Sequence, residues 1–186
     1  MPKISDIENT PNPNAMKFVL KEPLTWGIAH SYDNAAEAKD DPLASALFSI
    51  NHVTNVFYVD RWLTVTQDGH ADWEELMREV AVPIRAASAA DARSDAVTRT
   101  ATHTIADLSP QDQQRLSAIS ELLDAQIRPY LQGDGGDLYV VGLSGNKLSV
   151  HYQGACGTCP SSISGTLIGI TNLVRSIEPD IEVEAV

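Results

Sequence analysis

The sequence predicts an α+β protein made of two small α/β-sandwich domains joined by a flexible linker. Apolar patterns typical of helices and of strands alternate both at the front and at the back of the 186-residue chain. The stretch between them, residues 89–106, consists mainly of Ala, Ser, Thr and Asp and can bury little apolar surface. We therefore expect an N-terminal domain at 1–88 and a C-terminal domain at 107–186. An Ala-rich helix continuing from the front domain is the alternative for the first half of the linker.

The front domain contains recognisable start signals for two helices. Asp41-Pro42 predicts a helix with Asp as the N-cap and Pro at the first helical position. Asp72 caps a last helix, whose apolar residues recur every four positions at Leu76, Val80 and Ile84. A strand is expected at 16–20, and β-branched and aromatic residues at 53–59 and 62–66 predict a hairpin.

The back domain begins with the same capping pattern at Ser109-Pro110. Its first helix should bury Leu116, Ile119, Leu123 and Ile127 and end near Pro129. The Gly-rich run 133–136 lacks the Lys-Ser/Thr of a phosphate-binding loop and is interpreted as a turn. Strands are expected at 138–143 and 147–152, around a tight turn. A second helix follows, with an apolar stripe at Ile163, Leu167, Ile170, Val174 and Ile177, and a strand at 181–186 closes the chain.

The charge of the chain limits its partners. The formal net charge is −12, and such a surface repels phosphate backbones, so we expect no nucleic-acid partner. No apolar run approaches the roughly 20 residues that span a bilayer, so we expect no membrane partner. Residues 1–11 lack a secretory apolar region and contain Asp6 and Glu8 without any Arg, unlike a mitochondrial transit peptide. We expect a cytoplasmic protein, although a processed organellar protein would have the same residues.

Both cysteines of the chain lie in one short motif, Cys156-Gly157-Thr158-Cys159. A secreted disulfide scaffold would have more cysteines, whereas C-x-x-C spacing lets two sulfurs bind one metal ion or one cluster edge. Pro160 suits the first turn of the following helix, whose N-terminus favours thiolate over thiol. Gly154 and Gly157 remove side chains where an inorganic core would approach. We expect this ligand turn at the surface.

The spacing alone leaves three interpretations open: dithiol redox chemistry, a shared metal site, and cysteines without a cofactor. Thioredoxin-like proteins also place C-x-x-C after a strand, but only one helix and one strand follow here, too few for a thioredoxin sheet. A [4Fe–4S] cluster commonly takes four cysteines, which a two-fold dimer of this chain would supply. The rivals are a dithiol oxidoreductase and a zinc-bridged structural dimer. His151 is the histidine to examine as an accessory ligand.

Residues 128–172 resemble the NifU-like C-terminal domain of the Nfu proteins. The resemblance rests on three stretches and a final pair, namely Arg128-Pro129-Tyr130-Leu131-Gln132, Asp134-Gly135-Gly136-Asp137, the run 154–162 around the two cysteines, and Gly169-Ile170. The front half independently resembles the Nfu N-terminal domain through the run 10–18, Pro42-Leu43-Ala44 with Leu47-Phe48, and Trp73.

This resemblance implies a carrier rather than an enzyme. The C-terminal domain of such a protein would hold a [4Fe–4S] cluster between two protomers through Cys156 and Cys159. Its partners would be a cluster-donating scaffold and apo-proteins that receive the cluster, and the N-terminal domain would help to recognise them. Thr158 replaces the usual Gly of the family, and Leu167 and Thr171 replace a usual Lys and Glu. These departures bear on partner choice and cluster lability.

Overall fold

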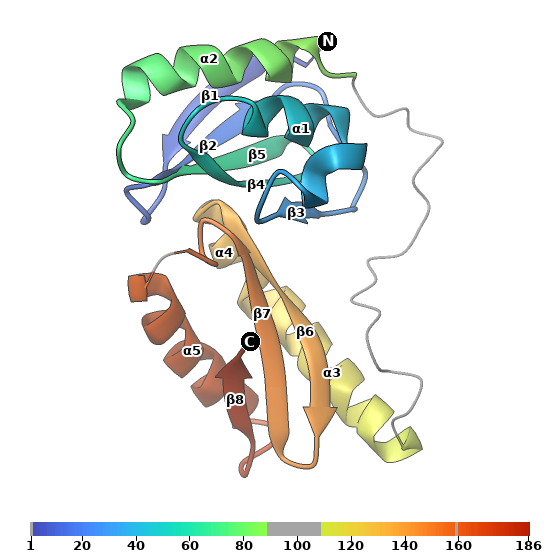
Figure 1. Cartoon of the computed structure of the whole chain (residues 1–186). Coiled ribbons are helices and arrows are strands. Elements are labelled where there is room, and N and C mark those ends of the chain that lie inside the picture. The colour runs from blue at the N-terminus through green and yellow to red at the C-terminus, as the bar shows by residue number, and fades with distance from the viewer. Residues whose placement is uncertain (1, 89–108, 159) are drawn as a thin grey trace. The chain divides into compact units, whose positions relative to one another are not determined.

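The computed structural model describes residues 2–88, 109–158 and 160–186, the side chains of 160–164 excepted (Figure 1). The chain divides into two compact units, 1–99 and 100–186. Each unit combines helices with a sheet and has its own apolar cluster, which confirms the α+β class and the two domains. The predicted linker at 89–106, like its helical alternative, lies outside the described residues, so the domain limits at 88 and 107 stay predictions.

The N-terminal unit is built on an antiparallel sheet with the strand order β1-β2-β5-β4-β3. The strands are β1 (Ile4–Asn9), β2 (Ala15–Leu20), β3 (His30–Tyr32), β4 (Val53–Val59) and β5 (Trp62–Gln67). The predicted strand β2 and the predicted hairpin β4–β5 are confirmed, with Asp60 in the left-handed region at the turn (φ 49°). The edge strands β1 and β3 were missed because β1 is mostly polar and exposed and β3 has three residues.

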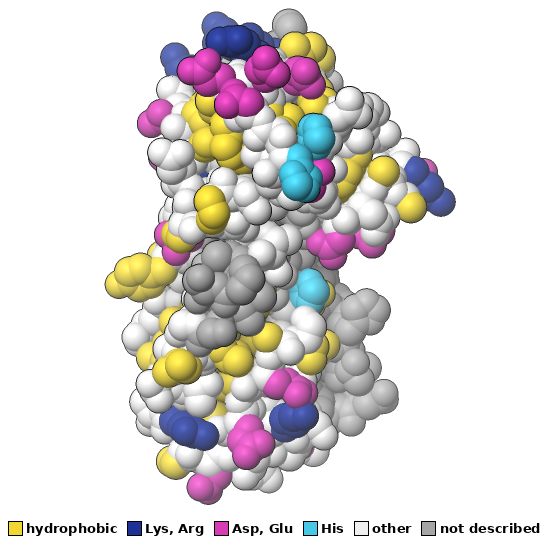
Figure 2. Space-filling view, turned by 60° about the vertical axis from the view of Figure 1, so that its left-hand side comes forward, with side chains coloured by type: hydrophobic (Ala, Val, Ile, Leu, Met, Phe, Trp, Pro, Cys, Tyr) yellow, Lys and Arg dark blue, Asp and Glu magenta, His cyan; other side chains and the backbone are white. Residues whose placement is uncertain are grey.

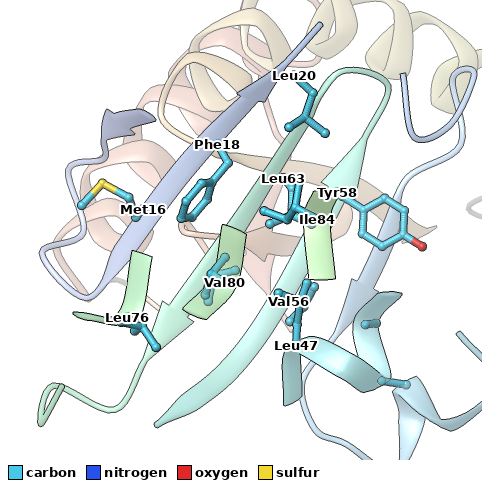
Figure 3. Packing of buried hydrophobic residues seen from close by; sticks show 13 residues of the cluster. Met16, Phe18, Leu20, Leu47, Val56, Tyr58, Leu63, Leu76, Val80 and Ile84 are labelled. Carbon is cyan, nitrogen blue, oxygen red and sulfur yellow. The ribbon is translucent and has the colours of Figure 1, made fainter. Parts of the chain in front are cut away.

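A short 3-10 helix, η1 (Glu37–Asp40), and two α-helices, α1 (Pro42–Phe48) and α2 (Trp73–Ala86), accompany this sheet. The side chains of Asp41 and Asp72 accept hydrogen bonds from the first turns of α1 and α2, as their positions predicted. Figure 3 shows the shared core, in which Leu47 of α1 and Val80 and Ile84 of α2 face sheet residues such as Phe18 and Leu63. Both helices therefore cover the same face of the sheet.

Asp41 also ties the start of α1 to two strands. Its Oδ1 accepts from the Ala44 amide at 2.9 Å, and its Oδ2 accepts from the hydroxyl of Tyr32 at 2.8 Å and from that of Tyr58. His30 stacks on Tyr58 with ring centroids 4.8 Å apart. These groups line a cavity of about 420 Å³. Because both carboxylate oxygens accept from protein donors, we assign this cluster a role in packing.

Burial alone would raise the pKa of Asp41, but the hydrogen bonds from Ala44, Tyr58 and Tyr32 outweigh it and lower the pKa below its usual value. A lowered folded-state pKa means that the ionised carboxylate stabilises the folded unit. This contribution is complete above the unfolded pKa of 3.8 and is lost as the pH falls through the folded value.

The C-terminal unit has the strand order β6-β7-β8. Its elements are α3 (Pro110–Gln126), α4 (Arg128–Gly133), β6 (Gly136–Ser144), β7 (Lys147–Gly154), α5 (Pro160–Val174) and β8 (Glu182–Ala185). The predicted first helix is two helices, because Pro129 cannot sit in a helix interior and instead occupies the first turn of α4. The β6–β7 pair is antiparallel, whereas β8 runs parallel to β7, so α5 makes the crossover between them.

The core of this unit consists largely of the predicted apolar residues. The buried residues are Leu116, Ile119 and Leu123 of α3, Leu131 of α4, Leu138 and Leu143 of β6, Leu148, Val150 and Tyr152 of β7, Ile170 and Val174 of α5, and Cys156 and Ile181. Ile127 packs at its margin, while Ile177 lies beyond the end of α5 and is 46% exposed. The stripe of α5 therefore ends at Val174 rather than at Ile177, and the side chain of Ile163 lies outside the described residues.

Charged side chains are distributed over the face shown in Figure 2. Acidic and basic side chains of the described residues both occur there, without an extended basic patch. Within the described parts of the chain, no helix has the length and apolar character needed to cross a bilayer.

The substitution Asp41→Asn should destabilise the N-terminal unit by about 1–2 kcal/mol at pH 7, because an amide cannot accept from two tyrosines and the helix start together. The difference from wild type should shrink as the pH falls below about 4. All three tryptophans, Trp26, Trp62 and Trp73, lie in this unit, so denaturation followed by tryptophan fluorescence reports on it selectively.

Asp40→Asn is the matched control, since the Asp40 side chain is exposed beside the same helix start. An equal loss in both variants, or a loss for Asp41→Asn that does not change with pH, would contradict the assigned role of Asp41.

Candidate functional site

The predicted ligand turn connects β7 to α5. Gly154, the last residue of β7, has φ 63° in the left-handed region, which explains a glycine there. Residues 155–158 form a turn, and α5 begins at Pro160 as predicted. Cys159 lies outside the described residues. The structure therefore describes one of the two proposed ligands, Cys156, and its surroundings.

Cys156 is buried, contrary to the expected surface position. Only 2% of the residue is exposed, and it belongs to the same apolar cluster as Leu131, Leu138 and Ile170. The next two residues, Gly157 and Thr158, are exposed. The second half of the turn is thus exposed to solvent, while its first half, Ala155 and Cys156, is buried in the unit. A metal centre outside the core can bind this sulfur only after the turn rearranges.

Gly136, at the start of β6, provides the space for the Cys156 side chain. A Cβ at position 136 would lie 2.5 Å from Sγ of Cys156 and 2.7 Å from the carbonyl oxygen of Gln153. Both distances are far below contact distance, and β6 pairs here with β7 through Gly136 and Gly154. The run 133–136 was predicted to be a turn, but Gly136 is a strand residue whose missing side chain makes room for the cysteine.

Backbone contacts attach the turn to the residue that precedes β6 and to the end of β7. The Ala155 amide donates to the Gly135 carbonyl at 3.1 Å, and the Gly157 amide donates to the Gly154 carbonyl at 3.1 Å. A Cβ at Gly157 would lie 3.0 Å from the carbonyl oxygen of Tyr152. The close approach that requires glycine at 157 is therefore to protein backbone, whereas the sequence had suggested an approach by an inorganic core.

A buried ion pair positions the beginning of β6. The guanidinium of Arg128 donates to Asp137, and Arg128 also bonds Asp124 at 2.8 Å. Burial raises the pKa of the Asp137 carboxyl, and the charge of Arg128 opposes this rise. The Leu138 amide donates to the same carboxylate at 2.7 Å. Asp137 is 4% exposed, so this pair holds the strand that carries Gly136 against α4. Only the family resemblance had drawn attention to these two residues.

Tyr152 is the residue near Cys156 that sequence reasoning missed. It lies on the core-facing side of β7, is 6% exposed, and its hydroxyl has no hydrogen-bond partner among the described residues. An unsatisfied buried hydroxyl costs about 1–3 kcal/mol. Burial raises the pKa of Tyr152 to about 12, and the charge of the Cys156 thiolate adds to the rise. The phenol therefore keeps its proton at neutral pH. A strand pattern alone would assign this tyrosine only to the core.

His151, the suggested accessory ligand, belongs to the other face of β7. Its Nδ1 lies 2.7 Å from the Val186 carbonyl oxygen, and its ring lies 5.1 Å from that of Tyr139. Side chains of neighbouring strand residues point to opposite faces, so His151 is directed away from the face that carries Tyr152. The structure thus does not bring His151 together with Cys156.

Among the described side chains, no three His, Cys, Asp or Glu residues are grouped so that they could hold a metal ion. Cys156 can therefore act only with ligands from elsewhere, either residues outside the described ranges or residues of a second chain. Its thiolate can bind iron, zinc or a second sulfur. The local geometry alone leaves these three chemistries open.

Comparison with known families shows which of these three chemistries is typical of the family to which the chain belongs. Residues 4–90 match the model of the Nfu/NifU scaffold protein N-terminal domain, and residues 119–184 match the NifU-like domain model. The second match includes both cysteines. The chain belongs to the Nfu family of iron–sulfur cluster scaffold proteins. The recognition made on sequence motifs is confirmed, and this family consists of scaffolds rather than enzymes, as expected.

Relatives of this Nfu chain cover nearly its whole length. The human protein named NFU1 iron–sulfur cluster scaffold homolog, mitochondrial, is 34% identical over 176 residues, covering 94% of this chain and 68% of the relative. The protein of the same name from Drosophila sechellia is 32% identical over 178 residues, covering 94% of this chain and 62% of the relative. The chain thus spans about three fifths of the length of the Drosophila relative.

A solved protein from Staphylococcus epidermidis is 30% identical and covers 45% of this chain and 96% of its own, with a TM-score of 0.35. That score is too low to support an argument.

The substitution Gly136→Ala should displace Cys156 and destabilise the C-terminal unit by about 1–3 kcal/mol, since the added methyl group overlaps a sulfur and a carbonyl oxygen. In the folded apo-protein, the reaction of Cys156 with an alkylating reagent should become faster in a Cys159→Ser background. Thermal unfolding followed by circular dichroism and thiol alkylation followed by mass spectrometry test the two effects.

Gly142→Ala is the matched control, because it lies on the same strand and its Cβ would meet nothing within 4 Å. If both alanine variants have wild-type stability and alkylation rate, the packing role of Gly136 is wrong.

Proposed function

We propose that this Nfu chain is a scaffold and carrier that holds one [4Fe–4S] cluster between two copies of itself and transfers it to apo-proteins. The observation that supports this most is the cysteine count: the chain has two cysteines, both inside the region that matches the NifU-like domain. A [4Fe–4S] cluster commonly takes four thiolates, and a two-fold dimer supplies Cys156 and Cys159 twice. Pro160 would begin the helix whose N-terminus favours both thiolates.

The chemistry of transfer is ligand exchange. Each iron–sulfur bond to a carrier cysteine breaks as a bond to a recipient cysteine forms, and the recipient thiol passes its proton to the released carrier thiolate. No atom changes oxidation state, so no oxidant or reductant is required. A cluster bound by two cysteines of each protomer has few bonds to either chain, which suits cargo that is handed on.

Loading requires the turn at 155–158 to open. Because Cys156 is 2% exposed within the apolar cluster, the groups that cover its sulfur must move aside before a second chain can share a cluster with it. The smallest such change moves the turn residues 156–158, since β7 and the described part of α5 are held by their packing in the core. The cost of opening lowers the apparent affinity for the cluster and favours its release.

The N-terminal unit is proposed to recognise the partners, namely a cluster-donating scaffold and apo-proteins that receive the cluster. It has its own core and no cysteine, so it contributes no thiolate ligand. The predicted linker at 89–106 would keep a docked recipient near the cluster. The cytoplasm remains our expected location, and a processed organellar form is compatible with relatives that are named mitochondrial.

Anaerobic reconstitution with iron and sulfide should give a dimer with about one [4Fe–4S] cluster per two chains, because one chain offers two thiolates. Size-exclusion chromatography combined with iron and sulfide analysis measures both quantities. A monomer with a full cluster would contradict the shared site. Zinc instead of iron would favour the structural dimer, and a redox-active disulfide without metal would favour the dithiol oxidoreductase.

Cys156→Ser and Cys159→Ser are the controls for this experiment. Each should prevent stable cluster binding while the secondary structure remains. If either variant keeps a normal cluster, a further ligand exists in the chain.

Residues 107–186 alone should still bind the cluster, whereas residues 1–88 alone should fold and bind none, because each unit has its own core and both cysteines lie in the second. The shortened carrier should deliver its cluster more slowly to at least some recipients. Transfer rates to several apo-proteins, compared between the full chain and the fragment 107–186, measure this effect. Equal rates for every recipient would leave the N-terminal unit without a role in recognition.

A further inference from the structure

Tyr152 carries a buried hydrogen-bond donor that the described fold does not use. Its hydroxyl oxygen is shielded from solvent, and no described residue accepts from it. Proteins rarely leave such groups unpaired, so an unpaired one calls for a partner that arrives later. The apolar side chains of the same cluster, among them Leu131, Leu138 and Ile170, offer no acceptor.

The position of this donor relates it to the ligand turn. Tyr152 lies on β7 four residues before Cys156, and both belong to one core cluster. The Tyr152 carbonyl is where a Cβ at Gly157 would make its closest contact, at 3.0 Å, so the tyrosine backbone touches the turn directly. The tyrosine is also close enough for the charge of the Cys156 thiolate to act on its phenol.

The surroundings of the Tyr152 hydroxyl would change when the cluster binds. A thiolate bound to iron, together with the inorganic sulfides of the cluster, brings several anionic sulfur acceptors to a place where the apo-protein has apolar side chains. Hydrogen bonds to such sulfurs stabilise the more negative, reduced cluster and so raise its reduction potential.

We propose that the Tyr152 hydroxyl is a hydrogen-bond donor to the cluster, directed at the Cys156 sulfur or an adjacent sulfide, and that it slows cluster loss. This inference rests on the proposed cluster binding. Tyr152 would be a positioning residue: it supplies no bond to iron, and it sets how tightly the site holds its cargo and at what potential. The hydroxyl has no partner among the described residues of the apo-protein and would gain one in the loaded protein, so this hydrogen bond would favour loading.

The substitution Tyr152→Phe removes this one oxygen and preserves the ring, and it should act with opposite signs in the two states. The apo-protein should be as stable as wild type or more stable, because an unpaired buried hydroxyl is removed. The loaded protein should lose its cluster to a chelator roughly tenfold faster. Its cluster should also have a more negative reduction potential than in wild type. A tyrosine with a purely structural role would not shift the potential.

Tyr139→Phe is the matched control, because Tyr139 loses the same oxygen on the neighbouring strand but on the other face of the sheet, beside His151. This variant should retain wild-type cluster lifetime and potential. The experiment uses the full chain, with thermal unfolding of the apo form, chelator challenge of the loaded form, and electrochemical titration.

A lower stability of apo Tyr152→Phe would overturn the inference, since it would show that the hydroxyl already has a partner. If wild type loads normally and the Tyr152→Phe cluster has the same lifetime and potential, the inference alone is overturned. If wild type takes up no iron and sulfide, the proposed function is overturned and this inference with it.

Discussion

The close approach of β6 to the cysteine turn is the constraint on which the rest of the C-terminal unit depends. Gly136 and Gly154 are paired across the two strands, and Gly136 has no side chain that would keep the cysteine out of the core. The ion pair of Arg128 with Asp137 fixes the first residues of β6 against α4. A strand, a helix and a turn are thus joined at one point, and the sulfur of Cys156 is enclosed by that junction.

Much of the fold could be predicted because its signals are local. Asp41, Asp72 and Ser109 cap helices in the structure as their positions indicated, and the strand patterns of β4, β5 and β7 were read correctly. Short or polar strands at sheet edges, β1 and β3, have no such pattern, because pairing with a neighbour rather than apolar periodicity defines them. The break between α3 and α4 follows from a proline whose two permitted positions, at the end of one helix or at the start of the next, look alike in sequence.

The site was predictable in its chemistry and less so in its surroundings. The two cysteines are adjacent in sequence, so their motif and its family could be recognised directly. The contact of Gly136 with Cys156 depends on the pairing of β6 with β7, which brings together residues about 20 positions apart. The unpaired hydroxyl of Tyr152 is a property of the packed core, which a strand pattern does not show. The burial of Cys156 is likewise a property of the packed unit. For that reason the expected surface position was wrong for Cys156, whereas Gly157 and Thr158 are exposed as expected.

The burial of Cys156 also governs how the apo-protein reacts with small-molecule reagents. A buried thiol reacts only from the fraction of molecules in which its cover is displaced, so the observed rate is the intrinsic rate multiplied by an opening equilibrium constant. The reactions of Cys156 with peroxide, copper ions and other disulfides are all slowed by this equilibrium constant. In the proposed function, a cluster donor that docked on the displaced turn would avoid this slowing, because its own contacts would supply the opening free energy. Under that proposal, the burial of Cys156 would give the apo-protein kinetic selectivity, because its thiol would be shielded in free solution and exposed only when a donor is bound.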